Sequence, residues 1–176
     1  MMQAAQLSTR VAYLPTGAYA TTSAHYSAAN QHEAMPRIKV NLPENFLFST
    51  EIHVRITDLN YGAHLGNDAL LGILHEARVK FLQQVGSMEV DRATGKGHIM
   101  ADVAIEYKGE AFYGDVLRIE MAANDFSRYG FDLVYWVRNQ DGREIARAKT
   151  GMLAFDYNTR KLMPLPTEYA QRLRGE

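Results

Sequence analysis

Several side chains that can carry acid–base or hydrolytic chemistry lie together in one polar stretch of the sequence. They are Asp58, Asn60, Tyr61, His64 and Asn67. An imidazole titrates near neutral pH and can act as a general base, while a carboxylate or an amide can position a water molecule. Asp and Asn are also common in turns and at helix caps. The stretch is therefore either a catalytic loop or a structural one, and the elements around it bear on that choice.

A long amphipathic helix is predicted directly after this polar stretch. Apolar residues recur there at spacings of three and four, at Leu70, Leu74, Ala77, Phe81 and Val85. Asn67 or Asp68 is expected to cap the start of the helix, and Gly86 is expected to end it. The N–H groups of the first turn have no partner within the helix, so they can polarise a carbonyl group or bind an anion. A carboxylate or an amide in the preceding loop could then position water beside that carbonyl.

Alternating apolar and polar residues predict one strand before the helix and four strands after it. Their expected ranges are 51–57, 99–107, 117–121, 131–137 and 145–155. Asn139–Gly142 is typical of a hairpin turn, and a short helix is expected over 167–174. Because tight turns join antiparallel neighbours, we predict an α+β protein whose antiparallel sheet wraps the one long helix. The other face of the sheet is left for solvent or for assembly, and a second chain could extend the sheet.

The chain length fits one domain with an extension. Of the 176 residues, 1–34 are rich in Ala, Ser, Thr and Gln and have no apolar signal-peptide core. We expect this segment to be a poorly ordered or over-long N-terminal extension, followed by a domain over 35–176. No apolar run approaches the roughly 20 residues that a membrane-spanning helix needs, so no membrane span is expected.

Composition excludes several classes of function. A formal net charge of −1 without a basic block argues against nucleic acid or an anionic membrane as the main partner. The absence of cysteine excludes a thiol nucleophile, a disulfide framework and Cys-ligated zinc, and it fits a reducing, cytoplasmic location. The 6 histidines are scattered and none pairs with a carboxylate at metal-ligand spacing, so no metal or other cofactor is expected. No G-x-S-x-G nucleophile elbow occurs either.

The stretch from Asp58 to Phe81 resembles the signature of hotdog-fold acyl-CoA thioesterases. This group includes 4-hydroxybenzoyl-CoA thioesterase and the plant acyl-carrier-protein thioesterases. Its members typically read D-x-D-x-x-G-H-V-N-N, followed by a helix that contains E-A-R. This chain reads DLNYGAHLGN from Asp58 and HEAR from His75. His64 and Asn67 match the family pattern at their positions.

Departures from the family pattern fall in the polar stretch itself. Asn60 stands where the family has its second Asp, which is usually the catalytic one. An amide carries no charge and cannot act as a base or as a carboxylate nucleophile. Ala63 and Gly66 replace a Gly and an Asn of the pattern, and the Asn used by the plant relatives falls on Gly62.

The resemblance implies a fold, an assembly and a reaction. A curved antiparallel sheet wraps a long central helix, and two chains pair sheet to sheet as a homodimer or a dimer of dimers. The site lies at the interface between the two chains. The implied substrates are acyl-CoA or acyl-carrier-protein thioesters. The helix N-terminus polarises the thioester carbonyl, and an acidic side chain attacks it or activates water.

Eight residues are candidate site residues on this reading. Asn60 is expected to orient water and His64 to act as the base, with Asp58 as the first choice for a carboxylate and Glu76 as the second. Substrate binding is assigned to Tyr61, Gly62, Gly66 and Asn67, with Tyr61 lining an acyl pocket. Three functions fit these residues: thioester hydrolysis, binding of an acyl thioester without turnover because of Asn60, and a hotdog lyase such as a dehydratase.

Overall fold

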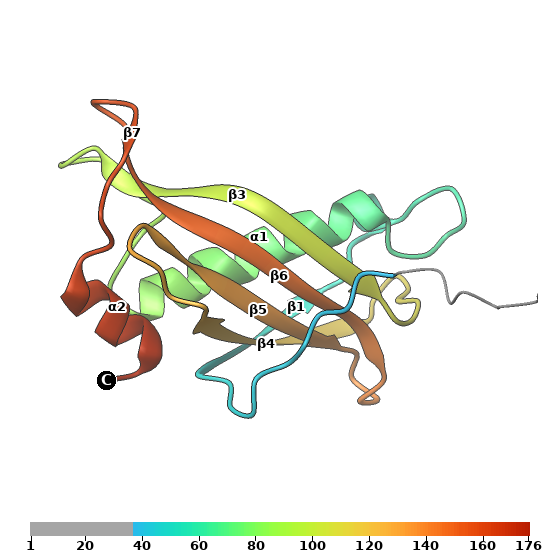
Figure 1. Ribbon diagram of the computed structural model, residues 1–176. Helices are drawn as coiled ribbons and strands as arrows, with labels where there is room; N and C mark the ends of the chain where they lie inside the picture. Colours follow the sequence, from blue (N-terminus) through green and yellow to red (C-terminus); the bar gives the residue numbers. More distant parts are fainter. Residues whose placement is uncertain (1–36) are drawn as a thin grey trace, which may run out of the picture. The chain divides into compact units, whose positions relative to one another are not determined.

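The computed structural model describes residues 37–176, which form one curved antiparallel sheet against a long helix, α1 (Figure 1). The helices are α1 (Asn67–Gln84) and α2 (Thr167–Arg174), with one 3-10 turn, η1 (Ile56–Asp58). The strands are β1 (Phe48–His53), β2 (Val90–Asp91), β3 (Lys96–Tyr107), β4 (Val116–Asn124), β5 (Gly130–Arg138), β6 (Glu144–Asp156) and β7 (Lys161–Leu162). The predicted α+β class is confirmed. The predicted extension over 1–34 lies outside the described residues.

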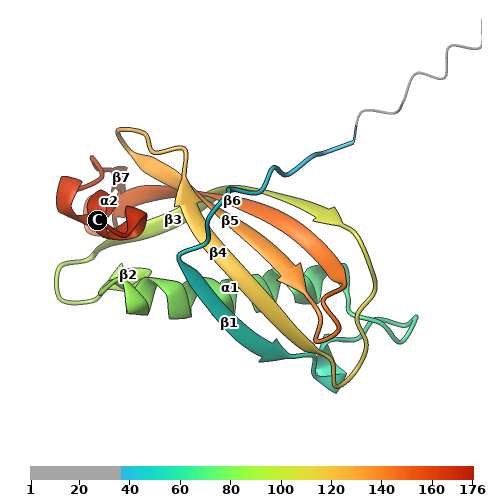
Figure 2. The ribbon, with the colours of Figure 1, turned by 90° about the horizontal axis from the view of Figure 1, so that it is seen from below.

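The sheet has the strand order β1-β4-β5-β6-β3-β2, and β7 pairs with β6. All neighbouring strands are antiparallel, and the predicted turn between β5 and β6 is closed by a hydrogen bond from Gly142 N–H to the Asn139 carbonyl (2.9 Å). β3 and β4 are consecutive in the chain but do not pair, because β3 lies beside β6. The helix α1 carries the chain from β1 on one side of the sheet to β3 on the other side, as Figure 2 shows.

The core lies between α1 and the concave face of the sheet. Leu70, Leu74, Ala77 and Phe81 are each at most 1 % exposed, so the predicted apolar face of the helix is confirmed. Side chains of the central strands meet this face and are fully buried: Leu117, Ile119, Met121, Leu133, Tyr135 and Val137. Burying a large apolar side chain stabilises a fold by about 1.5–3 kcal/mol. This contact therefore fixes α1, and with it the loop at its N-terminus. No helix among residues 37–176 is long and apolar enough to cross a membrane.

The first strand ends earlier than predicted. β1 stops at His53, and Ile56, which lies inside the predicted strand range 51–57, is 66 % exposed in η1. Val54, just after the strand, is buried. The cause is local: the Asp58 carboxylate accepts a hydrogen bond from the Arg55 backbone N–H (2.8 Å) and turns the chain. Strand alternation therefore ends where the polar loop begins.

β3 contains a bulge that reverses its alternation. The register with β6 shifts at Ala101, which leaves that residue without a partner. One extra residue moves every following side chain to the opposite face. His98 is buried before the bulge, whereas Ile105 packs against the core after it. A strand is found over the predicted range 99–107, but a single alternation does not hold across the bulge.

The outer edge of β3 is unpaired over most of its length within the described residues. β2 pairs only with Lys96 and Gly97. Beyond that point Met100, Val103 and Tyr107 are 40 %, 40 % and 49 % exposed. A long edge strand with exposed apolar side chains is a surface on which another strand can pair.

Candidate active site

Asp58 is clamped by Arg55 at the entrance to the polar loop. Besides the backbone contact, its carboxylate accepts hydrogen bonds from the guanidinium Nε (3.1 Å) and Nη2 (3.0 Å). The hydrogen bond from the Arg55 side chain lowers the pKa of Asp58 below its ordinary value. The Asp58 carbonyl also accepts a hydrogen bond from the Gly66 N–H (2.9 Å). These are the contacts of a residue that shapes the loop, and the catalytic role of Asp58 stays a prediction.

A tight turn brings Asn60 and His64 together. The Asn60 side-chain oxygen accepts a hydrogen bond from the Gly62 N–H (2.8 Å), and its carbonyl accepts one from the Ala63 N–H (3.0 Å). Ala63 has a φ of 60°, a left-handed conformation that a glycine adopts more easily. The Asn60 amide nitrogen is 3.4 Å from Nδ1 of His64. The loop thus holds an amide against an imidazole, and the roles of these two groups in handling water stay predictions.

The N-terminus of α1 is capped by Gly66 rather than by Asn67 or Asp68. Gly66 has extended backbone angles, and within residues 37–176 the helix has no side-chain cap hydrogen bond at this end. A Cβ at Gly66 would lie 2.7 Å from Oδ1 of Asp68, so a glycine fits this position without displacing that side chain. With no side-chain cap, the N–H groups of the first turn keep their capacity to bind an oxygen or an anion.

A cavity of about 170 Å³ opens beside this helix start. His64, Gly66 and Asn67 line it, together with Tyr107 and Glu110. The Tyr107 hydroxyl donates a hydrogen bond to the Asn67 carbonyl (3.2 Å), which joins β3 to the helix start. The structure therefore gathers three of the predicted site residues around one cavity.

Glu110 is the carboxylate that the sequence did not identify. It lies in the connection between β3 and β4, next to Ala111, whose carbonyl accepts a hydrogen bond from the Leu65 N–H (2.8 Å). This contact joins segments far apart in the chain, and nothing in the local sequence marks it. Glu110 forms no ion pair with any residue of 37–176.

Tyr61 and Glu76 lie away from this cavity. The Tyr61 side chain is fully exposed at the tip of the loop. Glu76 is exposed on α1 and pairs with Lys80 (2.9 Å). Within one chain neither residue reaches the helix start, and both assignments stay predictions that depend on a second chain.

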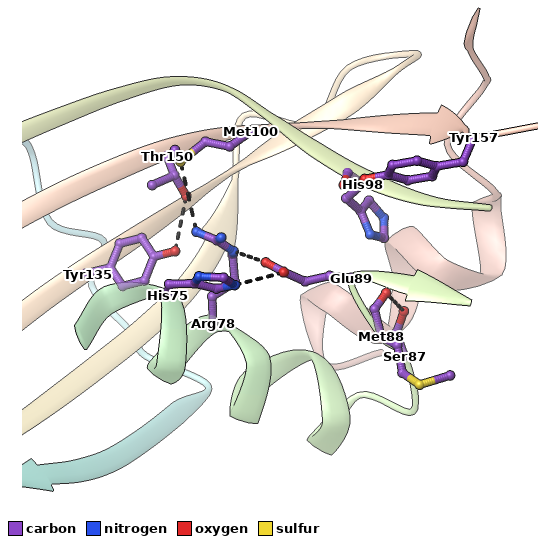
Figure 3. Close-up of polar contacts among 10 residues, drawn as sticks. All are labelled: His75, Arg78, Ser87, Met88, Glu89, His98, Met100, Tyr135, Thr150 and Tyr157. Carbon is purple, nitrogen blue, oxygen red and sulfur yellow. Dashed lines mark hydrogen bonds and ion pairs between the residues drawn. The ribbon is translucent and has the colours of Figure 1, made fainter. Parts of the chain in front are cut away.

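A buried polar cluster lies further along α1, as Figure 3 shows. Arg78, 6 % exposed, donates a hydrogen bond from Nε to Glu89 (2.6 Å), and the other Glu89 oxygen lies 2.9 Å from Nε2 of His75. These hydrogen bonds lower the pKa of Glu89, although burial opposes them. The Tyr135 hydroxyl pairs with Thr150 (3.1 Å) in the same region. The HEAR segment therefore supplies a structural ion pair with Glu89, a partner that the sequence did not predict.

A comparison with protein-family models identifies the family of this chain. A family model described as the thioesterase-like superfamily matches residues 54–173, which include the polar loop and α1. The chain belongs to this superfamily. A comparison with curated protein sequences finds no significant match.

Solved structures share the fold at low sequence identity. The 1,4-dihydroxy-2-naphthoyl-CoA thioesterase from Synechocystis has a TM-score of 0.66 and 20 % identity, covering 72 % of this chain and 94 % of that one. YbaW, a probable thioesterase from Escherichia coli, has a TM-score of 0.61 and 24 % identity, covering 71 % and 95 %. A Staphylococcus aureus protein in complex with CoA has a TM-score of 0.66 and 15 % identity, covering 76 % and 85 %. The predicted hotdog fold and thioesterase class are confirmed.

Proposed function

We propose that this thioesterase hydrolyses acyl-CoA thioesters at the N-terminus of α1. The observation that carries the proposal is the open helix start at Gly66, which meets His64 and Glu110 at one cavity. CoA is favoured over an acyl-carrier protein because the similar Synechocystis enzyme acts on a CoA thioester and the similar S. aureus protein binds CoA. The thioester carbonyl oxygen accepts hydrogen bonds from the first-turn N–H groups, where developing negative charge is stabilised.

Water is the nucleophile in this proposal. Glu110, or His64 held by Asn60, takes a proton from the water molecule as its oxygen bonds to the carbonyl carbon. The resulting oxyanion is stabilised by the helix start. It collapses with cleavage of the C–S bond, and the leaving CoA thiolate takes up a proton. The products are a carboxylic acid and free CoA thiol.

We further propose that the complete site forms between two copies of the chain. Among residues 37–176 the outer edge of β3 is unpaired beyond Gly97, and its exposed apolar residues include Tyr107, which contacts the helix start. Pairing of two β3 edges would continue the sheet across a two-fold axis and bury these residues. The measured mass of the assembly in solution distinguishes a dimer from a dimer of dimers.

The direct test is thiol release, followed with a chromogenic disulfide, from short-chain, long-chain and aromatic acyl-CoAs. We expect the parent protein to release CoA from at least one class, which then defines the acyl group. His64→Ala and Asn60→Ala should each lower turnover while leaving the fold intact, as measured by circular dichroism. Full activity in both variants would disprove the site assignment.

A binding module without turnover is the alternative that Asn60 favours. Asn60 occupies the position at which the family usually has its catalytic Asp. The Asn60 side chain already accepts a hydrogen bond from the Gly62 N–H and contacts the His64 ring. The variant Asn60→Asp separates the two functions. A silent parent with an active Asn60→Asp variant would support the binding module, whereas an active parent supports the enzyme.

A further inference from the structure

A second cavity, of about 570 Å³, lies against the end of β3, next to the cavity at the helix start. Tyr107 lines both cavities, so the two spaces meet at this side chain. The last residues of β3 and Lys108 line the second cavity on one side. Residues 37–39, which run beside the end of β3 (Figure 1), line it on the other side. Its volume lies within the range of ligand sites, roughly 300–1,000 Å³.

Residues 37–39 are held against β3 by their contacts with Glu106. Val40, which follows them, is 5 % exposed, and its backbone N–H donates a hydrogen bond to Oε2 of Glu106 (3.2 Å). Nζ of Lys39 lies 3.6 Å from Oε1 of the same carboxylate. Arg37 and Lys39 precede residue 54, where the family match begins. They are therefore features of this chain and not of the superfamily model.

Positive charge exceeds negative charge in this second cavity. Its three cations are Arg37, Lys39 and Lys108, and its one carboxylate is Glu106, so three positive charges and one negative charge leave a net charge of +2 on the lining. Nζ of Lys108 donates a hydrogen bond to Oε1 of Glu106 (2.6 Å). This hydrogen bond, with the Val40 N–H and Lys39, lowers the pKa of Glu106 to about 2, so the carboxylate is ionised at neutral pH.

The cations of this cavity are accessible to a ligand. The Lys39 side chain is 73 % exposed and the Lys108 side chain is 29 % exposed, although both approach Glu106. Arg37 is exposed as well. Ammonium and guanidinium groups bind phosphate oxygens through charge-assisted hydrogen bonds. An extended ligand that leaves the helix-start cavity past Tyr107 would therefore meet a surface suited to phosphate.

We propose that Arg37, Lys39 and Lys108 bind the phosphate groups of CoA while the thioester lies at the helix start. The proposal rests on the proposed function, because it extends the same substrate from one cavity into the next. CoA carries its phosphates at the end remote from the thioester, so a ligand that spans both cavities places them away from the first turn of α1. None of the three cations lines the helix-start cavity, so they act on substrate binding and not on the chemical step.

The test compares an acyl-CoA with the acyl-pantetheine thioester of the same acid, which has the same reacting group and no phosphate. Lys39→Glu reverses the charge of a largely exposed side chain, so the fold should be retained. We expect this variant to raise KM for the acyl-CoA at least tenfold, with kcat within twofold of the parent and with kcat/KM for acyl-pantetheine unchanged. Added NaCl should raise KM for the acyl-CoA in the parent and leave KM for acyl-pantetheine unchanged, since salt screens charges at an exposed site.

Lys161→Glu is the matched control. It makes the same change at an exposed lysine of β7. Lys161 pairs with Asp156, which lies opposite Lys96 at the first position of β3, so the control lies at the other end of that strand from Tyr107. This variant should keep the KM of the parent for both substrates.

Calorimetric titration with CoA and with pantetheine separates this proposal from thioester hydrolysis, because binding needs no turnover. We expect the parent to bind CoA at least tenfold more tightly than pantetheine, and Lys39→Glu to lose that difference. A parent that binds in this way but releases no thiol from any thioester would refute the proposed function and support the phosphate site. The proposal is wrong if the parent binds CoA no better than pantetheine, if Lys39→Glu binds CoA like the parent, or if this variant loses activity toward acyl-pantetheine to the same extent as toward acyl-CoA.

Discussion

At the scale of single residues, three carboxylates compete for the catalytic role, and their surroundings rank them. Asp58 has both oxygens occupied by Arg55, and Glu76 pairs with Lys80 on the helix surface. Glu110 lines the cavity at the helix start. We expect Glu110→Gln to lower kcat by about 100-fold, the size of a general-base effect, with little change in KM. Glu76→Gln is the matched control and should stay within about twofold of the parent. Equal losses in both variants would contradict the ranking.

The Asp58 clamp predicts a pH dependence of stability. Its pKa is lowered in the folded protein, so the ionised form contributes stability above its unfolded pKa of about 3.9, and that contribution is lost as pH falls through the folded value. At pH 7 we expect Asp58→Asn to lower the free energy of unfolding by about 1–2 kcal/mol, a modest value because Arg55 is largely exposed. Urea unfolding from pH 7 down to pH 3 measures this. A difference between the two proteins that persists undiminished at pH 3 would show that the charge is not its cause.

The sequence identified His64, Gly66 and Asn67 at the cavity because the polar loop is contiguous with the helix that positions it. Glu110 could not be found in this way, since it reaches the site through sheet topology and not through its neighbours in the chain. The same holds for Glu89, which pairs with Arg78. The clamp on Asp58 could not be foreseen either, because a turn-forming Asp and a catalytic Asp look alike before the partner of the carboxylate is known, and its catalytic role stays a prediction.

At the scale of elements, α1 contains a glycine that its local packing does not require. A Cβ at Gly72 would meet no atom within 4 Å in the described chain. We expect Gly72→Ala to raise the free energy of unfolding by about 0.5–1 kcal/mol, because glycine is unfavourable inside a helix. The same substitution at Gly86, where φ is +69°, should instead cost about 1 kcal/mol. Urea unfolding of both variants checks the opposite signs, and a loss of stability at Gly72 would contradict an open helix face there.

The long elements were largely predictable, because each has a clear apolar period. The four long strands after the helix and the helix face follow from spacing alone, and α2 follows from the chain break at Pro164 and Pro166. The end of β1 could not be predicted from spacing, because a single hydrogen bond to the Asp58 side chain decides it. The bulge at Ala101 could not be predicted either, because it depends on how β3 pairs with β6. The two short strands β2 and β7 are likewise too brief to show any period.

At the scale of the whole molecule, the unpaired edge of β3 connects assembly to activity. Within residues 37–176 this long strand is open beyond Gly97, although natural sheets normally protect such edges. The cavity at the helix start is lined by Tyr107 at the end of the same strand. An assembly through β3 would therefore bury the apolar edge and bring a second chain close to the proposed site.

A charge introduced on this surface tests that connection. We expect the parent to be a dimer, or a dimer of dimers, by light scattering coupled to size-exclusion chromatography. Val103→Lys places a cation on the exposed edge strand, where two copies would repel each other across a two-fold axis. This variant should shift toward the monomer and lose thiol release in parallel. Leu162→Lys makes the same type of change on β7, at an apolar residue of similar exposure, 47 %, and should keep both mass and activity. If the Val103→Lys protein keeps the mass and the activity of the parent, the interface and the completed site do not lie at β3.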